Sequence, residues 1–216
     1  MRGNAIAPEG ATAVTLLAMV RHAETDWSSE GRIQGRTDIA LSEAGRAFLA
    51  AREIPASCRS MRVVTSPLQR CVETAALLGL ESAEKEPRIA EMSWGEWEGH
   101  RLSDLRARFG EAMRVNEARG LDFMPPGGES PRQVLHRVRG WLSEVAAAGV
   151  PTLAIAHRGV LRVVLAAATH WDMLGRPPVK LDWGAAQFFT LDEVGIPSLA
   201  SMNVPLPMRP PGAARP

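Results

Sequence analysis

Two histidines, each beside an arginine, stand directly after short apolar runs of the chain. These pairs are Arg21-His22 and His157-Arg158, and a third apolar run is followed by Arg70. Short runs of this kind predict buried strands. Ligands of open α/β sheets bind just beyond the carboxyl ends of such strands. Two histidines and three arginines at three such ends are suited to a doubly charged phosphate, which arginine binds with two parallel hydrogen bonds.

The rest of the chain alternates predicted strands with amphipathic helices. Further strands are expected at 62–65, 187–191 and 198–204, and helices at 43–54, 67–78, 102–119, 131–145 and 160–168. Ser42 and Ser66 are the expected helix caps of two of them, with Pro67 in the first helical position. Alternation of this kind predicts an α/β fold, a three-layer α/β/α sandwich with a mostly parallel central sheet.

The length of 216 residues and the 45% hydrophobic content are enough for one substantial core,. We expect a flexible N-terminal extension over 1–13 and one catalytic domain over 14–204. A helical insert is expected at about 100–120, outside the sheet and near the mouth of the site. The Pro-rich stretch 205–216 is expected to be a disordered tail.

Charge and cysteine usage limit the partners and the compartment. The formal net charge is +1, whereas a nucleic-acid or membrane-surface partner calls for a clustered basic excess. Cys58 and Cys71 are far apart and form no CxxC motif, which favours a reducing, cytoplasmic setting,. No run reaches membrane-spanning length. The expected partner is a small phosphorylated substrate, with no nucleic acid and no membrane; a homodimer is left open.

Five motifs resemble, in order, those of the histidine phosphatase superfamily, the phosphoglycerate mutase-like family. They are Arg21-His22-Ala23-Glu24-Thr25; Gly31-Arg32-Ile33-Gln34-Gly35; Ser66-Pro67-Leu68-Gln69-Arg70-Cys71; Glu91 with Gly95-Glu96-Trp97-Glu98-Gly99; and His157-Arg158-Gly159-Val160. The Pro126-Gly127-Gly128-Glu129-Ser130 stretch also matches, and the resemblance covers about residues 15–190. It implies a phosphoglycerate mutase-like fold.

The resemblance implies a phosphohistidine intermediate on His22, with Arg21, Arg70 and His157 binding the transferred phosphoryl group. The residue chemistry agrees, because a neutral imidazole has a free lone pair near pH 7. A cationic His157 would add charge that is useful in the transition state. We expect no cofactor, because no metal-ligand, Walker-type or dinucleotide-binding spacing is found in the chain.

By resemblance the proton donor is Glu91, before the Gly-Glu-Trp-Glu-Gly stretch. Nearby tryptophans would exclude water there, and a bound phosphate dianion favours the protonated carboxyl. The rival acids are Glu24, Glu96, Glu98 and Glu129.

Five further residues are expected at the substrate. Thr25 and Gln34 are expected to hydrogen-bond the phosphate or its bridging oxygen, the alternative being a local turn contact. Glu129 and Ser130 either close the pocket or are turn and helix-cap residues. Arg158 replaces the small residue that usually follows the second histidine; it either favours a second anionic group or bonds to the far side of the turn.

The preferred function is a metal-independent phosphomonoesterase acting on a small phosphorylated metabolite. The segment at Glu91 lacks the longer basic motif of the cofactor-dependent phosphoglycerate mutases. A mutase must keep its phosphorylated intermediate, whereas a phosphatase must admit water, so hydrolysis is favoured. The alternatives are a phosphoglycerate mutase and a non-catalytic phosphate-binding or scaffold protein on the same fold.

Overall fold

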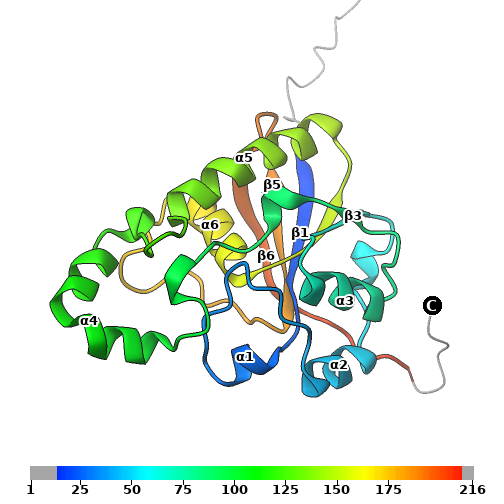
Figure 1. Ribbon diagram of the computed structural model, residues 1–216. Coiled ribbons are helices and arrows are strands. Elements are labelled where there is room, and N and C mark those ends of the chain that lie inside the picture. Colours follow the sequence, from blue (N-terminus) through cyan, green and yellow to red (C-terminus); the bar gives the residue numbers. More distant parts are fainter. Residues whose placement is uncertain (1–13, 211–216) are drawn as a thin grey trace, which may run out of the picture.

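A six-stranded sheet forms the centre of the protein, in a computed structural model that describes residues 14–210 (Figure 1). The strands are β1 (Thr15–Arg21), β2 (Arg62–Thr65), β3 (Glu84–Lys85), β4 (Thr152–Ala156), β5 (Ala185–Leu191) and β6 (Pro197–Pro205). Their order is β3-β2-β4-β1-β5-β6. The first four are mutually parallel, while β5 pairs antiparallel with β1 and β6 antiparallel with β5.

Helices cover both faces of this sheet, as the three-layer prediction requires (Figure 1). They are α1 (Asp26–Ser29), α2 (Glu43–Ala50), α3 (Gln69–Leu77), α4 (Leu102–Glu117), α5 (Pro131–Ala148) and α6 (Arg158–Thr169). Short 3-10 turns lie at Ala56–Cys58, Pro87–Ile89, Gly95–Trp97 and Gly120–Asp122. The α/β fold class is confirmed. The helix α4 occupies the stretch expected as an insert, and Figure 1 shows it extending away from the sheet.

The strands build two cores because successive side chains point to opposite faces of the sheet. Leu17 and Met19 of β1 pack into the cluster that includes α5 and α6. Ala18 and Val20 of the same strand pack into the cluster that includes α2 and α3. A strand buried on both faces reads as a continuous apolar run, which is why β1 and β4 were recognisable in the sequence.

Side-chain caps mark the starts of α1, α2 and α5. The Ser42 hydroxyl accepts a hydrogen bond from the Gly45 N–H at the start of α2. Ser130 caps α5 with a reciprocal bond from Gln133, a capping box,. The expected cap at Ser66 is wrong, because α3 begins only at Gln69 with Leu68 at its cap. The Ser66 hydroxyl accepts from the Leu68 N–H instead and lies beside a histidine of the site.

The C-terminal prediction needs a correction over residues 205–210. The Leu206 side chain is buried in the core cluster under α2 and α3. The backbone beyond it pairs with the chain after α2: Glu53 donates to Pro207, and Arg209 donates to Ala51. Apolar burial and these hydrogen bonds offset the entropy of ordering the segment. The expected extension at 1–13, and the tail over 211–216, lie outside the described residues.

We predict that Leu206→Ala lowers the free energy of unfolding by about 2–4 kcal/mol, the usual cost of truncating a buried leucine. Urea unfolding followed by circular dichroism measures this. The matched control is Met208→Ala, because Met208 is 64% exposed, and a change within about 0.5 kcal/mol is expected there. Equal stability of the two variants would show that the segment does not contribute to the core.

Candidate active site

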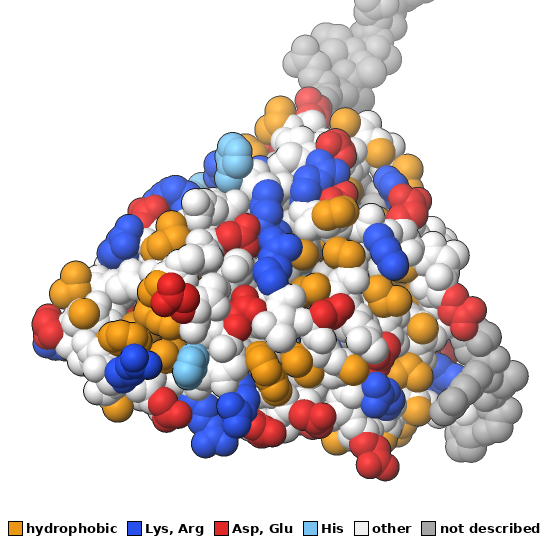
Figure 2. Space-filling model, viewed as in Figure 1, with side chains coloured by type: hydrophobic (Ala, Val, Ile, Leu, Met, Phe, Trp, Pro, Cys, Tyr) orange, Lys and Arg blue, Asp and Glu red, His pale blue; other side chains and the backbone are white. Residues whose placement is uncertain are grey.

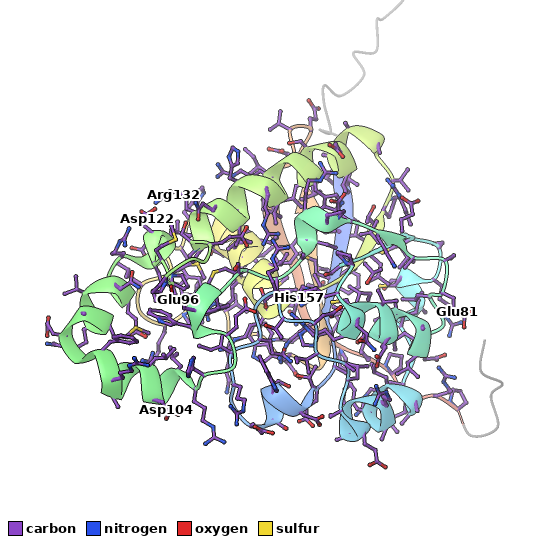
Figure 3. The ribbon with its side chains drawn as sticks, viewed as in Figure 1. Glu81, Glu96, Asp104, Asp122, Arg132 and His157 are labelled. Carbon is purple, nitrogen blue, oxygen red and sulfur yellow. The ribbon has the colours of Figure 1, made fainter. Side chains whose placement is uncertain are left out.

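The site lies where three neighbouring strands, β2, β4 and β1, end side by side. The parallel register aligns Arg21 with Ala156, and the His22 N–H donates to the Ala156 carbonyl at 3.0 Å. The rings of His22 and His157 are therefore neighbours, with centroids 5.2 Å apart. Figure 3 shows His157 in the interior, where β4 meets α6.

His22 is set up as a nucleophile by a single hydrogen bond. Its Nδ1 lies 2.7 Å from the Ala23 carbonyl oxygen. A carbonyl can only accept, so Nδ1 carries the proton and Nε2 has a free lone pair. Burial lowers the pKa of His22 well below its usual value, and Arg21 and Arg70 lower it further. The imidazole is therefore neutral at pH 7, as nucleophilic attack requires.

Two arginines supply unpaired donors at this position. Among the described residues, the buried side-chain nitrogens and oxygens without a hydrogen-bond partner are the Nε atoms of Arg21 and Arg70. Arg70 is fully buried, and its other nitrogens donate to the carbonyls of Gly35 and Thr37 at 2.8 and 3.0 Å. A buried donor without a partner is energetically costly. Both Nε–H groups therefore indicate a place for an anion.

His157 is fully buried beside His22. Its Nε2 lies 2.7 Å from the Ser66 hydroxyl and 3.4 Å from the Cys71 sulfur. Burial lowers the pKa of His157 well below its usual value, and His22, Arg70 and Arg21 lower it further. Without a neighbouring anion, these effects favour the neutral ring, which is a hydrogen-bonding group without charge.

The Glu91 carboxylate is held at the start of α6. Both of its oxygens accept from the Gly159 N–H, at 3.1 and 3.2 Å, and Oε1 also accepts from the Met92 N–H at 2.9 Å. A Cβ on residue 159 would overlap Oε1 of Glu91. Glycine at 159 therefore permits the carboxylate to sit against the backbone that follows His157.

These groups meet an open cavity of about 1070 Å³. Of the predicted site residues, Arg21, His22, Gln34, Glu91 and Arg158 line it. Arg70 and His157 are fully buried and lie behind this lining. The structure thus brings all the predicted catalytic residues together, some at the surface of the cavity and some beneath it.

Thr25 and Gln34 bond to each other instead of standing free. The Gln34 side-chain amide donates to the Thr25 hydroxyl, and this hydroxyl also accepts from the Ser28 N–H as the cap of α1. Thr25 is fully buried. Its geometry matches the turn contact that was the alternative in the sequence, and only Gln34 of the two reaches the cavity.

Glu129 and Ser130 make structural contacts, which was the alternative to closing the pocket. Ser130 caps α5. Glu129 pairs with Arg137 at 3.0 Å and accepts from the Ser93 N–H, so it fastens α5 to the segment that follows Glu91. Neither residue lines the cavity.

The rival acid Glu98 is also engaged elsewhere. Its carboxylate accepts from the backbone N–H groups of Arg36, Thr37 and Trp94. These bonds connect the loop whose carbonyls hold Arg70 to the segment after Glu91. Burial raises the pKa of Glu98, but the hydrogen bond from the Thr37 hydroxyl and these backbone bonds together outweigh it and lower that pKa.

Sequence reasoning missed two residues of the cavity wall, Trp183 and Arg162. The Trp183 ring lies under two guanidinium groups, those of Arg158 at 5.1 Å and Arg21 at 5.7 Å. No local signal marks Trp183, which stands in a loop before β5. Arg162 had one available signal, its position one helical turn after Arg158.

Among the described residues, no three His, Cys, Asp or Glu side chains form a group able to hold a metal ion. Within residues 14–210, no helix has both the length and the apolar content needed to cross a bilayer. Cys58 and Cys71 are both free and buried.

The family model of the histidine phosphatase superfamily (branch 1) matches residues 17–203. The chain belongs to this superfamily. Among curated members, it is 39% identical over 140 residues to phosphoserine phosphatase 1 of Hydrogenobacter thermophilus. This match covers 60% of this chain and 63% of that protein, so the chain spans less than two thirds of the length of this relative. It is 31% identical over 182 residues to glucosyl-3-phosphoglycerate phosphatase of Mycolicibacterium vanbaalenii, covering 75% and 80%.

A third histidine phosphatase relative is 2,3-bisphosphoglycerate-dependent phosphoglycerate mutase 2 of Gloeobacter violaceus, 32% identical with coverage of 73% and 77%. Among solved structures, mycobacterial glucosyl-3-phosphoglycerate phosphatase in complex with inorganic phosphate superposes with a TM-score of 0.73 at 25% identity, covering 89% of this chain and 98% of that one. Membership of the superfamily, together with the phosphatases among its relatives, supports the assignment of the chain as a phosphoric monoester hydrolase.

We predict that the free energy of unfolding of this histidine phosphatase decreases as the pH falls below about 6.5. Below that pH the unfolded chain binds protons at His22 and His157, whereas the folded protein does not, because folding lowers both pKa values,. Each lowered pKa contributes stability that is present above about pH 6.5 and is lost as the pH falls toward the folded value. The slope is at most about 1.4 kcal/mol per pH unit for each histidine. Urea unfolding at several pH values between 5 and 7 measures it.

The control is His22→Asn, which removes one of the two titrations and should flatten the slope between pH 5 and 7. Identical slopes in the two proteins would mean that His22 is protonated in the folded state over this range.

Proposed function

We propose that this protein is a metal-independent phosphomonoesterase that hydrolyses a small phosphorylated metabolite through a phosphohistidine on His22. One observation carries the proposal: the unpaired, buried Nε–H groups of Arg21 and Arg70 accompany a neutral His22 whose Nε2 is free. Unpaired N–H donors bind an anion, and a free imidazole lone pair attacks an electrophile. A phosphomonoester is both.

In the first step Nε2 of His22 bonds to phosphorus while the bond from phosphorus to the ester oxygen breaks. The electron pair of that bond stays on the departing oxygen, which takes a proton from Glu91. The imidazole becomes positive, and its Nδ1–H keeps its bond to the Ala23 carbonyl. This contact stabilises the charge and holds the ring in line with the leaving group.

In the second step the Glu91 carboxylate takes a proton from water as the water oxygen bonds to phosphorus. The bond from Nε2 to phosphorus breaks, neutral His22 returns, and inorganic phosphate leaves. Glu91 suits both steps because it lines the same cavity as His22 and is fixed by the N–H of Gly159. The open cavity admits the water that hydrolysis needs.

The phosphoryl oxygens are proposed to bind Arg21, Arg70 and His157. These groups interact electrostatically with His22, the two arginines lowering its pKa. A phosphate dianion placed beside His157 favours its protonated form, so the neutral ring becomes a charged donor when substrate binds. Charge that appears on binding adds to transition-state stabilisation.

A phosphoglycerate mutase is the second candidate, favoured by mutases among the relatives. Isomerisation of 3-phosphoglycerate with added bisphosphate, measured against release of phosphate, separates the two activities. A non-catalytic phosphate-binding or scaffold protein is the third. A free nucleophile and a nearby acid count against it, because binding alone requires neither.

The proposal includes a cytoplasmic enzyme without nucleic-acid partners. The two buried free cysteines suit a reducing compartment,. Figure 2 shows acidic and basic side chains interspersed over the face it draws. Nucleic acid is instead attracted by a continuous basic surface.

We predict that His22→Ala abolishes hydrolysis of phosphomonoesters, including in the presence of a chelator, without loss of the fold. Initial rates on a panel of monoesters with EDTA present measure this, and mass spectrometry after alkaline quench locates the phosphohistidine. His136→Ala is the matched control, since His136 is exposed on α5. Full activity of the His22 variant, or a phosphoryl group on another residue, would contradict the mechanism.

We predict that Glu91→Gln slows the hydrolysis of alkyl phosphates by about 10²–10⁴-fold, the usual contribution of general acid catalysis. Its effect on p-nitrophenyl phosphate should be much smaller, because p-nitrophenolate departs without a proton. The control is Glu96→Gln, at an exposed rival acid that does not line the cavity and lies apart from His157 in Figure 3. A uniform loss on both substrate types would remove Glu91 as the acid.

A further inference from the structure

Two arginines of α6 face the cavity from successive turns of the helix. Arg158 is its first residue, Arg162 lies four positions later, and both line the cavity. Like charges at this spacing repel each other on a helix surface. Burial and the neighbouring Arg158 both lower the pKa of Arg162. The fold therefore carries an electrostatic cost at this wall of the cavity.

Neither arginine side chain has an acidic partner or a hydrogen bond within residues 14–210. Other arginines of the same cavity do: Arg32 pairs with Glu30 at 2.6 Å, and Arg106 pairs with Glu117 at 2.7 Å. Among the described residues, the lack of a partner thus distinguishes Arg158 and Arg162 from Arg32 and Arg106, and they share it with Arg21, whose buried Nε also has no partner.

Aromatic rings hold both guanidinium groups in place. Arg158 lies over Trp183 at 5.1 Å, and Arg162 lies over Trp171 at 4.9 Å. Such cation–π contacts orient an arginine but leave its N–H donors unsatisfied. Two oriented forks with free donors are the arrangement that binds a carboxylate or a phosphate.

The carboxylates of the cavity are engaged elsewhere. Glu24 accepts from the Ser42 hydroxyl at 3.1 Å, Glu91 accepts from backbone N–H groups, and Glu117 pairs with Arg106. No acidic side chain that lines the cavity therefore neutralises Arg158 and Arg162.

We propose that Arg158 and Arg162 bind a second anionic group of the substrate, so that the preferred substrates are phosphomonoesters bearing a carboxylate or a second phosphate. This inference rests on the proposed phosphatase and deepens it. The Trp183 ring contacts both Arg158 and Arg21, so the second site shares a wall with the phosphoryl site. The cavity of about 1070 Å³ has room for both groups of one ligand.

The test compares substrates that differ in one anionic group. Phosphoserine differs from phosphoethanolamine only by its carboxylate, and fructose 1,6-bisphosphate differs from fructose 6-phosphate by a phosphate. The readout is the ratio of kcat/KM within each pair, because damage to the phosphoryl site changes both members and cancels. We expect wild type to prefer the more anionic member, and the pair with the larger ratio identifies the second group.

We expect Arg158→Gln and Arg162→Gln each to reduce that ratio about 10-fold or more, as loss of a charged hydrogen bond does. Arg158→Lys should retain part of the preference. Arg139→Gln, the same change at an exposed arginine of α5 outside the cavity lining, should leave the ratio unchanged. A ratio near one in wild type, or a ratio that both α6 variants preserve, would overturn the inference.

Calorimetric binding separates failure of this inference from failure of the proposed function. Phosphoserine and phosphoethanolamine are titrated into His22→Ala protein, with and without the α6 substitutions. Tighter binding of phosphoserine that disappears with Arg158→Gln or Arg162→Gln supports the second anion site even if wild type turns over no monoester. Equal affinities would overturn it even if the enzyme is an active phosphatase.

Discussion

The parallel register of β2, β4 and β1 is the constraint on which the site depends. Because these strands lie side by side and end at the same edge, the residues after them become neighbours without any long connection. Ser66 and His157 follow His22 by 44 and 135 residues in the chain, and they come together with it in this way. A shift of one residue in this register would turn the histidines toward opposite faces of the sheet.

Polar groups are buried at this edge at a cost that the rest of the fold offsets. Arg70 is fully enclosed with one donor unsatisfied, and burial together with the positive field of Arg21 and Arg70 keeps His22 and His157 neutral. A buried charge and an unsatisfied buried donor both lower the stability of the fold. The two apolar clusters on either side of the sheet supply the compensating burial. A phosphate dianion would satisfy all of these groups together, so the cost of burying them is linked to the affinity for substrate.

Loops complete the arrangement from a distance. Carbonyls of Gly35 and Thr37 hold Arg70, and Glu98 fixes the same loop to the segment that follows Glu91. These contacts add no chemistry of their own. They restrict the side chains that act, because an arginine or carboxylate on a flexible loop would lose much of its binding energy to ordering.

The sequence by itself determined the α/β class, the buried strands and the pairing of His22 with His157, since these depend on local apolar runs and on motif order. The start of α3 and the packing of Leu206 were decided by tertiary contacts that outweigh local propensity,. The neutral state of His157 and the role of Trp183 were likewise invisible in sequence. Charge state depends on burial and on neighbours that are distant in the chain, and only the folded structure brings those neighbours together.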